Sequence, residues 1–438
     1  MSTHTTDPST APDMLDVVPP RPLNKHDFKT LSLASLGGAL EFYDFIIFVF
    51  YAQIISHLFF PATLDPFWAM LNTYGTFAAG YFARPLGGIV MAHFGDMIGR
   101  KKMFALSILL MALPTMAIGL MPTFASIGYA APILLLLMRI LQGIAIGGEV
   151  PGAWTFVSEH VPKKRVGFAN GLLTCGLSAG ILFGAVVALV MEKSFSSEEL
   201  ATWAWRLPFI LGGVLGLVTM YLRRWLKETP VFQAMQAKKA LSRELPVKTI
   251  LKQHRSGIVL SALLTWFLTA GVVVILLATP QIMSGQYGIP RETAFTMQSS
   301  AIVIEAILCV FTGYIADKVG AGKTLIVGAI ALAISSFFFY GSLAGGDLNT
   351  IFLTYMLTVA AVGVVGVVPM GMILSFPAAV RFTGVSFSYN VSYAVLGGIT
   401  LPLIQVLSRY SDLGIAYYIL FMCVIALGCG LYMMKKKM

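Results

Sequence analysis

Long apolar segments separated by short polar turns dominate the chain. Each segment is long enough to cross the hydrocarbon layer of a membrane, which is about 30 Å thick, as a straight or tilted helix. The pattern predicts an all-α membrane protein with twelve transmembrane helices, because a spanning helix satisfies its own backbone hydrogen bonds. The predicted spans lie near residues 31–58, 67–92, 103–122, 128–155, 168–191, 205–225, 257–283, 293–316, 324–343, 349–375, 384–408 and 414–434.

The longest polar interval between spans, residues 226–256, divides the spans into six and six. We therefore expect an amino-terminal six-helix bundle over 31–225 and a carboxy-terminal one over 257–438, which ends in a short basic tail. The linker between them is basic, and we expect its helix-compatible middle to lie along the membrane surface. Residues 1–30 are rich in Ser, Thr, Pro and Asp without an apolar core, which predicts a disordered tail and no cleaved signal peptide.

A repeat relates the two bundles. Residues 84–102 read RPLGGIVMAHFGDMIGRKK, and residues 305–323, which lie 221 positions later, read EAILCVFTGYIADKVGAGK. Two related halves predict pseudo-symmetric six-helix bundles, as in many transporters. The second copy lacks the arginine of the first turn, so we expect any contact made by its turn to rely on Lys318 or Lys323 and to be weaker. The paired positions are Arg84 with Glu305, Asp96 with Asp317, and Gly99 with Gly320.

Composition excludes several classes of function. Of the 438 residues, 57% are hydrophobic and 11% are charged, whereas soluble domains carry about a quarter charged residues. The formal net charge is +10, but basic clusters interleaved with aromatic residues are missing, so we expect no nucleic-acid partner. The four cysteines fall in apolar segments without metal-type spacing, which predicts neither disulfides nor a metal site. No loop is large enough for a catalytic domain, so we expect neither an enzyme nor a cofactor.

Lysines and arginines predict the orientation. The side that receives both tails and the 226–256 linker collects most of them. The opposite loops hold only Lys193, Arg206, Arg291 and Arg409. The positive-inside rule therefore places both termini in the cytoplasm.

Ionisable residues inside the spans are the first candidates for function, because each costs about 2.5–3.5 kcal/mol to insert. Glu41 and Asp44 lie three residues apart on one face of the first span, and Arg139 and Gln142 share a face of the fourth. A carboxylate beside an arginine can couple transport to protons, because protonation frees the arginine for an anionic substrate. We predict proton coupling by Asp44, Glu41, Arg139 and Glu305.

Each of these residues also has a structural interpretation. Arg84, Arg139 and Glu149 can tie helices to one another or to backbone carbonyls. The aromatic face around Phe42 and Tyr43 favours lipid contact and packing over a ligand cage. The sequence leaves both interpretations open.

Three motifs resemble those of the major facilitator superfamily. The turn GDMIGRKK, residues 95–102, resembles the signature turn of that superfamily. Arg139, Gln142 and Gly143 form the RxxQG pattern carried by its proton-coupled members. The stretch SEHVPKKRVG, residues 158–167, resembles its cytoplasmic gate segment.

Further stretches resemble one branch, the metabolite:proton symporters, whose members import 2-oxoglutarate, citrate, shikimate, proline or betaine. The resemblance runs from about residue 31 to residue 406. It implies the twelve-helix fold in two bundles that rock about a central site. The stretches are EFYDF at 41–45, ARPLGG at 83–88, GGE at 147–149, WRLPF at 205–209, RRWLKETPVF at 223–232 and FPAAVRFTGVSFSYN at 376–390.

The resemblance also implies a gate. Asp96 is expected to lie against the start of the eleventh span, whose helix dipole favours an anion, and Arg100 is expected to reach Glu159. These contacts would latch the cytoplasmic side while the protein faces outward. The residues assigned to gating are Gly95, Asp96, Gly99, Arg100, Glu149, Glu159, Arg165 and Asp317.

Substrate choice rests on the buried charges. Arg139 and Arg84 suit a carboxylate, which favours small organic acids or zwitterions over cationic or apolar drugs. Glu305 is not expected from the family pattern, and it can meet an ammonium group, serve as a second proton site or bond to a neighbouring span. The residues assigned to substrate binding are Arg139, Arg84, Gln142, Tyr43, Trp266, Gln298, Tyr389, Asn390 and Tyr393.

The sequence thus predicts a monomeric, proton-coupled secondary transporter of a bacterial inner membrane. It would import a small carboxylate-bearing metabolite, either a di- or tricarboxylate or a zwitterion such as proline or betaine, by alternating access. Osmolyte carriers of the branch can have a long charged tail, and its lack here favours organic acids slightly. The alternative is a proton-antiport exporter of a drug or siderophore, since such proteins share the RxxQG residues.

Overall fold

The computed structural model describes residues 17–237 and 246–438, and within these ranges the chain is helical without a strand. The helices of the first group are α1 (Lys25–Phe50), α2 (Ala52–Phe59), α3 (Pro66–Ile98), α4 (Arg100–Leu120), α5 (Phe124–Ile127), α6 (Ala130–His160), α7 (Val166–Ser194), α8 (Ser197–Glu199) and α9 (Arg206–Arg223). The helices of the linker are α10 (Pro230–Ala237) and α11 (Pro246–Gln253). Those of the second group are α12 (Arg255–Thr269), α13 (Thr279–Gln286), α14 (Arg291–Val319), α15 (Ala321–Leu343), α16 (Leu348–Val362), α17 (Val368–Leu374), α18 (Arg381–Ser392), α19 (Gly398–Tyr410) and α20 (Gly414–Lys435).

Ten helical segments of the described chain are long and apolar enough to cross a membrane. The two other predicted spans coincide with α3 and with the run from α18 to α19. The prediction of an all-α membrane protein with twelve spans is confirmed.

The first helix begins earlier than expected. Residues 1–16 lie outside the described residues, but α1 already begins at Lys25 and not near residue 31. The side chain of Asn24 accepts hydrogen bonds from the first turn, and the Asp27 side chain accepts one from the Asn24 backbone, which forms a capping box. Asp27 also forms an ion pair with Arg21. The prediction of a disordered tail up to residue 30 is therefore wrong for residues 25–30, which form the first turns of α1.

Both copies of the repeated turn have the same backbone conformation. Gly99 precedes α4 with φ of 121°, and Gly320 precedes α15 with φ of 96°. Side chains strongly disfavour these angles, so glycine lets the chain reverse between two spans within one residue. The repeat seen in the sequence is therefore a repeat of structure.

Three spans of the second group are interrupted along their length. A π-helical turn (η5, Ala270–Ala278) joins α12 to α13, and another (η8, Tyr393–Gly397) joins α18 to α19. A 3₁₀ turn (η6, Gly363–Val367) joins α16 to α17. Breaks of this kind are frequent at binding sites inside membranes. All three contribute residues to the cavities described below.

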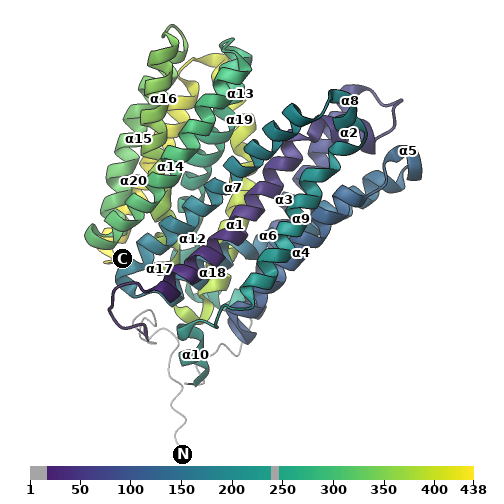
Figure 1. The fold of residues 1–438 in the computed structure, drawn as a ribbon. Coiled ribbons are helices and arrows are strands. Elements are labelled where there is room, and N and C mark those ends of the chain that lie inside the picture. Colours follow the sequence, from purple (N-terminus) through teal and green to yellow (C-terminus); the bar gives the residue numbers. More distant parts are fainter. Residues whose placement is uncertain (1–16, 238–245) are drawn as a thin grey trace, which may run out of the picture.

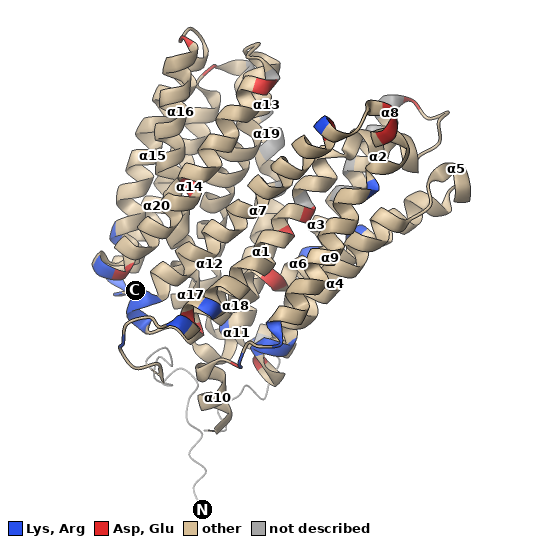
Figure 2. Cartoon of the chain, in the orientation of Figure 1, with Lys and Arg blue, Asp and Glu red and all other residues tan. Residues whose placement is uncertain are grey.

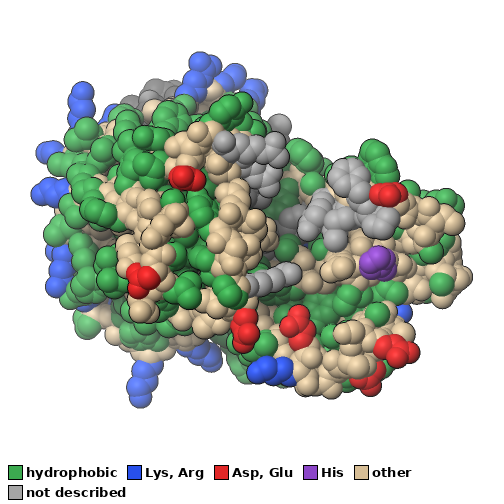
Figure 3. Space-filling model, turned by 90° about the horizontal axis from the view of Figure 1, so that it is seen from above, with side chains coloured by type: hydrophobic (Ala, Val, Ile, Leu, Met, Phe, Trp, Pro, Cys, Tyr) green, Lys and Arg blue, Asp and Glu red, His purple; other side chains and the backbone are tan. Residues whose placement is uncertain are grey.

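The two groups of helices converge at one end of the molecule and diverge towards the other (Figure 1). The described ends of the chain, with most lysine and arginine side chains, lie at the convergent end (Figure 2). The divergent end shows mainly hydrophobic and uncharged side chains, with scattered acidic ones (Figure 3). Contact between the groups runs along α7 against α14 and α3 against α18.

The linker is helical on both sides of residues 238–245, which lie outside the described residues, as does the middle of the predicted surface helix. Val231, Phe232 and Met235 of α10 form a small apolar cluster with Ala378 of the second group. The linker therefore packs under both groups at the convergent end.

Candidate functional site

A buried polar network inside the first group joins α1 to α4 and α6. Arg139 Nη1 lies 3.6 Å from Asp44 Oδ2. Gln142 donates to Asp44 Oδ2 over 2.8 Å and accepts from Arg139 over 2.8 Å. Thr115 donates to Asp44 Oδ1 over 2.8 Å. The carboxylate of Asp44 is thus held by two neutral donors and one guanidinium, and it is 2% exposed.

A second buried pair joins α1 to α3. Arg84 Nη2 lies 3.7 Å from Glu41 Oε1, which is beyond hydrogen-bonding distance. Arg84 Nη2 and Glu41 Oε2 are buried without a hydrogen-bond partner among the described residues. The Arg84 guanidinium also lies against tyrosine rings, 5.4 Å from the centroid of Tyr81 and 4.9 Å from that of Tyr393. A buried donor and a buried acceptor are therefore available to a ligand at the same place.

A cavity between the two groups lies beside both pairs. Arg84, Arg139 and Glu41 line it from the first group, and Tyr393 of η8 lines it from the second. Its volume is about 30 Å³ in this conformation, so a substrate can enter only if the walls move apart. Asp44 does not line this cavity, so Arg139 stands between Asp44 and the cavity.

A neighbouring cavity surrounds Glu305 of α14. Its wall includes Phe42, Trp154, Tyr389 and Tyr393, together with Ser178 of α7. Glu305 is fully buried, and its carboxyl group accepts hydrogen bonds from the Cys309 thiol, 3.0 Å from Oε1, and from the Ser178 hydroxyl. The structure thus brings Glu305 to the same interface as Arg84 without pairing the two.

At the convergent end, Asp96 crosses from the first group to the second. Its Oδ2 accepts from the Thr383 backbone N–H over 2.9 Å and from the Thr383 hydroxyl over 2.8 Å. Thr383 lies in the first turn of α18, where the helix dipole favours an anion. This is the position that the resemblance implies for Asp96.

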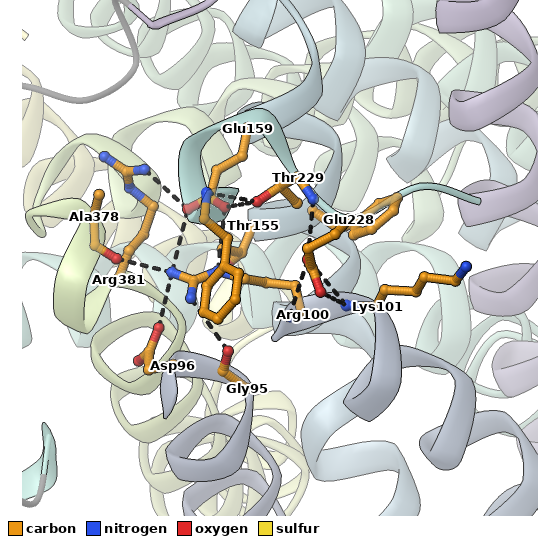
Figure 4. A network of polar contacts seen from close by, with 12 residues as sticks. Gly95, Asp96, Arg100, Lys101, Thr155, Glu159, Glu228, Thr229, Ala378 and Arg381 are labelled. Atoms are coloured by element: carbon orange, nitrogen blue, oxygen red, sulfur yellow. Dashed lines mark hydrogen bonds and ion pairs between the residues drawn. The ribbon is translucent and has the colours of Figure 1, made fainter. Parts of the chain in front are cut away.

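Arg100 and Glu159 extend this contact into a network (Figure 4). Arg100 lies 2.9 Å from Asp96 Oδ1 and 3.2 Å from Glu159 Oε2, and it donates to the Ala378 carbonyl over 2.8 Å. Glu159 also binds Arg381 of the second group over 3.1 Å. Each of these four charged groups is at most 1% exposed. The network therefore holds the two groups together in a site shielded from water.

The second copy of the turn forms its own contact, through a different residue than expected. Asp317 Oδ1 accepts from the Gly167 N–H over 2.6 Å, and Oδ2 accepts from the Phe168 N–H over 2.9 Å. Both donors belong to the first turn of α7, directly after Arg165. The approach is close, because a side chain at Gly313 would overlap the Gly167 backbone. The expectation that this turn relies on Lys318 or Lys323 is wrong, because Asp317 binds the helix end itself.

Glu149 does not belong to this gate in the structure. It forms an ion pair with Arg223 of α9, 2.5 Å between Oε1 and Nη2, and it accepts from the Ser107 hydroxyl. These partners all lie in the first group, and both charged residues are 1% exposed. Because removing one partner of such a buried pair typically costs about 3–5 kcal/mol, Glu149 stabilises the bundle rather than bridging the groups.

Three residues assigned to substrate binding lie elsewhere. The Tyr43 hydroxyl donates to the Pro208 carbonyl inside the first group, whereas Phe42, expected to face lipid, lines both cavities. Trp266 donates to the Tyr418 hydroxyl, and Gln298 donates to the Leu276 carbonyl, so both are engaged within the second group. The structure does not bring Tyr43, Trp266 or Gln298 to either cavity, and Gln142 and Asn390, which were also assigned to substrate binding, line neither one.

The tyrosines and the asparagine of the eleventh span do meet the first group. Tyr393 stacks on Tyr81 with ring centroids 5.9 Å apart. Asn390 donates to the Gly147 carbonyl over 2.7 Å and accepts weakly from Arg84 Nε over 3.4 Å. Tyr389 lies 5.6 Å from the Arg84 guanidinium, measured to its ring centroid.

No role is predicted from the sequence for several residues that take part in these contacts. Arg381 and Thr383 stand in the stretch FPAAVRFTGVSFSYN, and Arg223 stands in RRWLKETPVF, so both stretches were noticed without a role for these residues. Trp154 follows the GGE motif by five positions on α6 and gave no signal beyond apolar character.

The chain is similar to several known proteins along most of its length. A family model described as Major Facilitator Superfamily matches residues 34–402. The inner membrane metabolite transport protein YhjE of Escherichia coli (strain K12) is 34% identical over 393 residues, which cover 87% of this chain and 88% of YhjE. The proline/betaine transporter of Salmonella typhimurium is 32% identical over 428 residues, covering 92% and 83% of the two chains. Among solved structures, the proton:xylose symporter XylE from E. coli with bound 6-bromo-6-deoxy-D-glucose superposes with a TM-score of 0.77. The superposition covers 93% of this chain and 95% of XylE at 19% sequence identity, so it shows a similar fold alone.

Proposed function

We propose a function for this chain, which belongs to the Major Facilitator Superfamily and is a membrane transporter. On that premise, we propose that it imports a small carboxylate-bearing metabolite together with protons across a bacterial inner membrane. The observation that carries the proposal is the pair of carboxylate–arginine contacts at one cavity, Asp44 with Arg139 and Glu41 with Arg84.

The coupling between proton binding and substrate binding depends on which member of the Asp44–Arg139 pair lines the cavity. Arg139 lines it and Asp44 does not. A proton on Asp44 removes the charge that holds Arg139, while Thr115 and Gln142 still bind the neutral carboxyl group. The charge of Arg139 is then no longer balanced by Asp44, so an anion in the cavity binds more strongly. Proton and substrate therefore favour each other's binding, which is what symport requires.

The substrate carboxylate is assigned to Arg84, whose Nη2 is buried without a hydrogen-bond partner in the described chain. Glu41 in the same cavity disfavours a second carboxylate and favours a cationic group. A zwitterion such as proline or betaine therefore fits better than a di- or tricarboxylate. The names of several relatives, which include proline/betaine transporters, agree with this preference.

Wild-type protein in proteoliposomes tests the substrate class. We expect counterflow exchange of proline and glycine betaine with kcat/KM at least about tenfold higher than for citrate or 2-oxoglutarate, because one like-charge contact costs more than about 1.4 kcal/mol. Equal or faster exchange of citrate would contradict the zwitterion preference. Accumulation of the substrates only by everted vesicles would favour the exporter.

The gate network supports alternating access with the convergent end in the cytoplasm. Basic side chains gather at that end, as the positive-inside rule requires of a cytoplasmic face. There, Asp96 binds α18 and Asp317 binds α7 in matching ways. We assign the structure to a state closed towards the cytoplasm, in which these two contacts latch the halves.

Asp96→Asn is expected to shift the halves towards the state open to the cytoplasm. The change removes charge-assisted hydrogen bonds worth about 1.5–3 kcal/mol in total, which corresponds to a tenfold or larger change in the equilibrium. The probe is a cysteine introduced by Ser386→Cys in a background in which the four native cysteines are replaced by serine. Ser386 is buried at the interface, where it donates to the Gly147 carbonyl. Its labelling rate should rise about tenfold.

Asp412→Asn serves as the control, because Asp412 is exposed. It should leave the labelling rate unchanged. A labelling rate in Asp96→Asn equal to that of the control would show that Asp96 is not a latch.

A further inference from the structure

Glu305 is a buried charge without a counter-charge. It is 0% exposed, and no ion pair to it is found among the described residues. Its hydrogen-bond donors are two neutral groups, the Cys309 thiol at Oε1 and the Ser178 hydroxyl, and neither balances its charge. A carboxylate in this setting is costly unless a cation or a proton joins it. The coupling described above uses neither Glu305 nor its cavity.

The walls of that cavity are aromatic. Trp154 and Tyr389 meet edge to face with ring centroids 5.1 Å apart, and Tyr389 meets Tyr393 at 5.5 Å. Phe42 completes the aromatic lining. Trp154 is 1% exposed, and its Nε1 also has no hydrogen-bond partner among the described residues. Aromatic faces around one carboxylate form the environment in which proteins bind quaternary or alkylated ammonium groups.

This cavity and the one at Arg84 share two walls, Phe42 and Tyr393. The centroid of the Tyr393 ring lies 4.9 Å from the Arg84 guanidinium. Arg84 and Glu305 occupy equivalent positions of the two repeats, 221 residues apart. Arg84 and Glu305 therefore lie in adjacent cavities that share aromatic walls.

We propose that the cavity at Glu305 holds the ammonium group of a zwitterionic substrate whose carboxylate binds Arg84. The proposal rests on the proposed function and extends it with a second subsite. Glu305 balances the positive charge, and the faces of Trp154, Phe42 and Tyr393 surround the alkyl groups on nitrogen. The ammonium group of the substrate supplies a counter-charge that no described residue gives to Glu305.

Two compounds of equal shape isolate this charge. Glycine betaine carries a trimethylammonium group, and 3,3-dimethylbutanoate carries a tert-butyl group with the same carboxylate. We expect wild-type protein to prefer glycine betaine, as measured by the ratio of KM values in counterflow exchange. Glu305→Gln should raise KM for glycine betaine at least about tenfold and leave KM for 3,3-dimethylbutanoate within about twofold.

The ratio is measured in one preparation, so it does not depend on the fraction of protein that folds. Glu305→Asp keeps the charge and should retain most of the preference for glycine betaine. Glu292→Gln is the matched control, because Glu292 lies exposed on the same helix. It should leave both KM values unchanged.

A preference for glycine betaine that survives Glu305→Gln would overturn the proposal. If, in addition, the dependence of uptake on the proton gradient changes in this variant, Glu305 is a proton site instead. If wild-type protein exchanges neither compound, the proposed function falls first. Exchange of both compounds with an unchanged ratio in Glu305→Gln removes the second subsite alone.

Discussion

Arg84→Ala is expected to lower kcat/KM for uptake of every carboxylate-bearing substrate at least about 100-fold. Arg84 lines the cavity with a buried Nη2 that has no hydrogen-bond partner in the described chain, and a guanidinium binds a carboxylate through two charge-assisted hydrogen bonds. Each contributes about 1.5–3 kcal/mol, so losing both exceeds the roughly 2.7 kcal/mol that a 100-fold change requires. Initial rates of uptake into proteoliposomes measure the effect.

Loss of a binding group must be separated from loss of the fold. Arg84→Ala leaves Glu41 buried without its cation, which typically costs about 3–5 kcal/mol of stability. The double variant Arg84→Ala with Glu41→Gln removes that unpaired charge, so its thermal unfolding midpoint should recover while uptake stays low. Arg84→Lys keeps the charge without the planar fork and should fall between. Wild-type uptake by the stable double variant would move the carboxylate site elsewhere.

Asp44→Asn is expected to abolish accumulation driven by a pH gradient, while counterflow exchange stays within about threefold of wild type. Asparagine keeps the shape: its single amide oxygen can accept from Gln142, and its NH2 group can donate to the Thr115 hydroxyl, which can itself donate to the Met111 carbonyl. It can no longer change its charge. The charge of Arg139 is then never balanced by residue 44, as is the case when Asp44 carries a proton. The accumulation ratio should fall to about one, because no step of the cycle then depends on the gradient.

Asp347→Asn is the matched control for this substitution. Asp347 caps α16 and is exposed at that helix end, and asparagine caps a helix about as well as aspartate does. It should leave both accumulation and exchange unchanged. If Asp44→Asn still concentrates substrate against its gradient, the proton is carried elsewhere, and Glu41 is the next candidate.

The fold could be predicted from the sequence because its signals are local and periodic. Apolar runs of membrane length gave the spans, and the repeat gave the relation between the halves. Gly99 and Gly320 stood in matching motifs and have the same unusual backbone angle. Asp44 and Arg139 were conspicuous because charge inside a span is costly and demands a partner.

The rest of the site depends on which helices meet, and no local pattern contains that information. Phe42 and Tyr43 are neighbours, yet only Phe42 reaches the cavities, because one residue along a helix turns the side chain by about 100°. No role is predicted for Arg381 from the sequence, but it is buried against Glu159. Trp154 looked like ordinary apolar packing until the position of α14 placed it beside Glu305.

The proposed mechanism is cotransport of protons and a carboxylate-bearing substrate into the cell. It is tested most directly by purified wild-type protein in proteoliposomes that carry an imposed pH gradient, acidic outside, with labelled glycine betaine or proline on the outside. We expect the labelled substrate to accumulate inside the proteoliposomes above its outside concentration, and we expect this accumulation to be lost when a protonophore is added. Uptake that only equilibrates, at the same rate with and without the gradient, would contradict it.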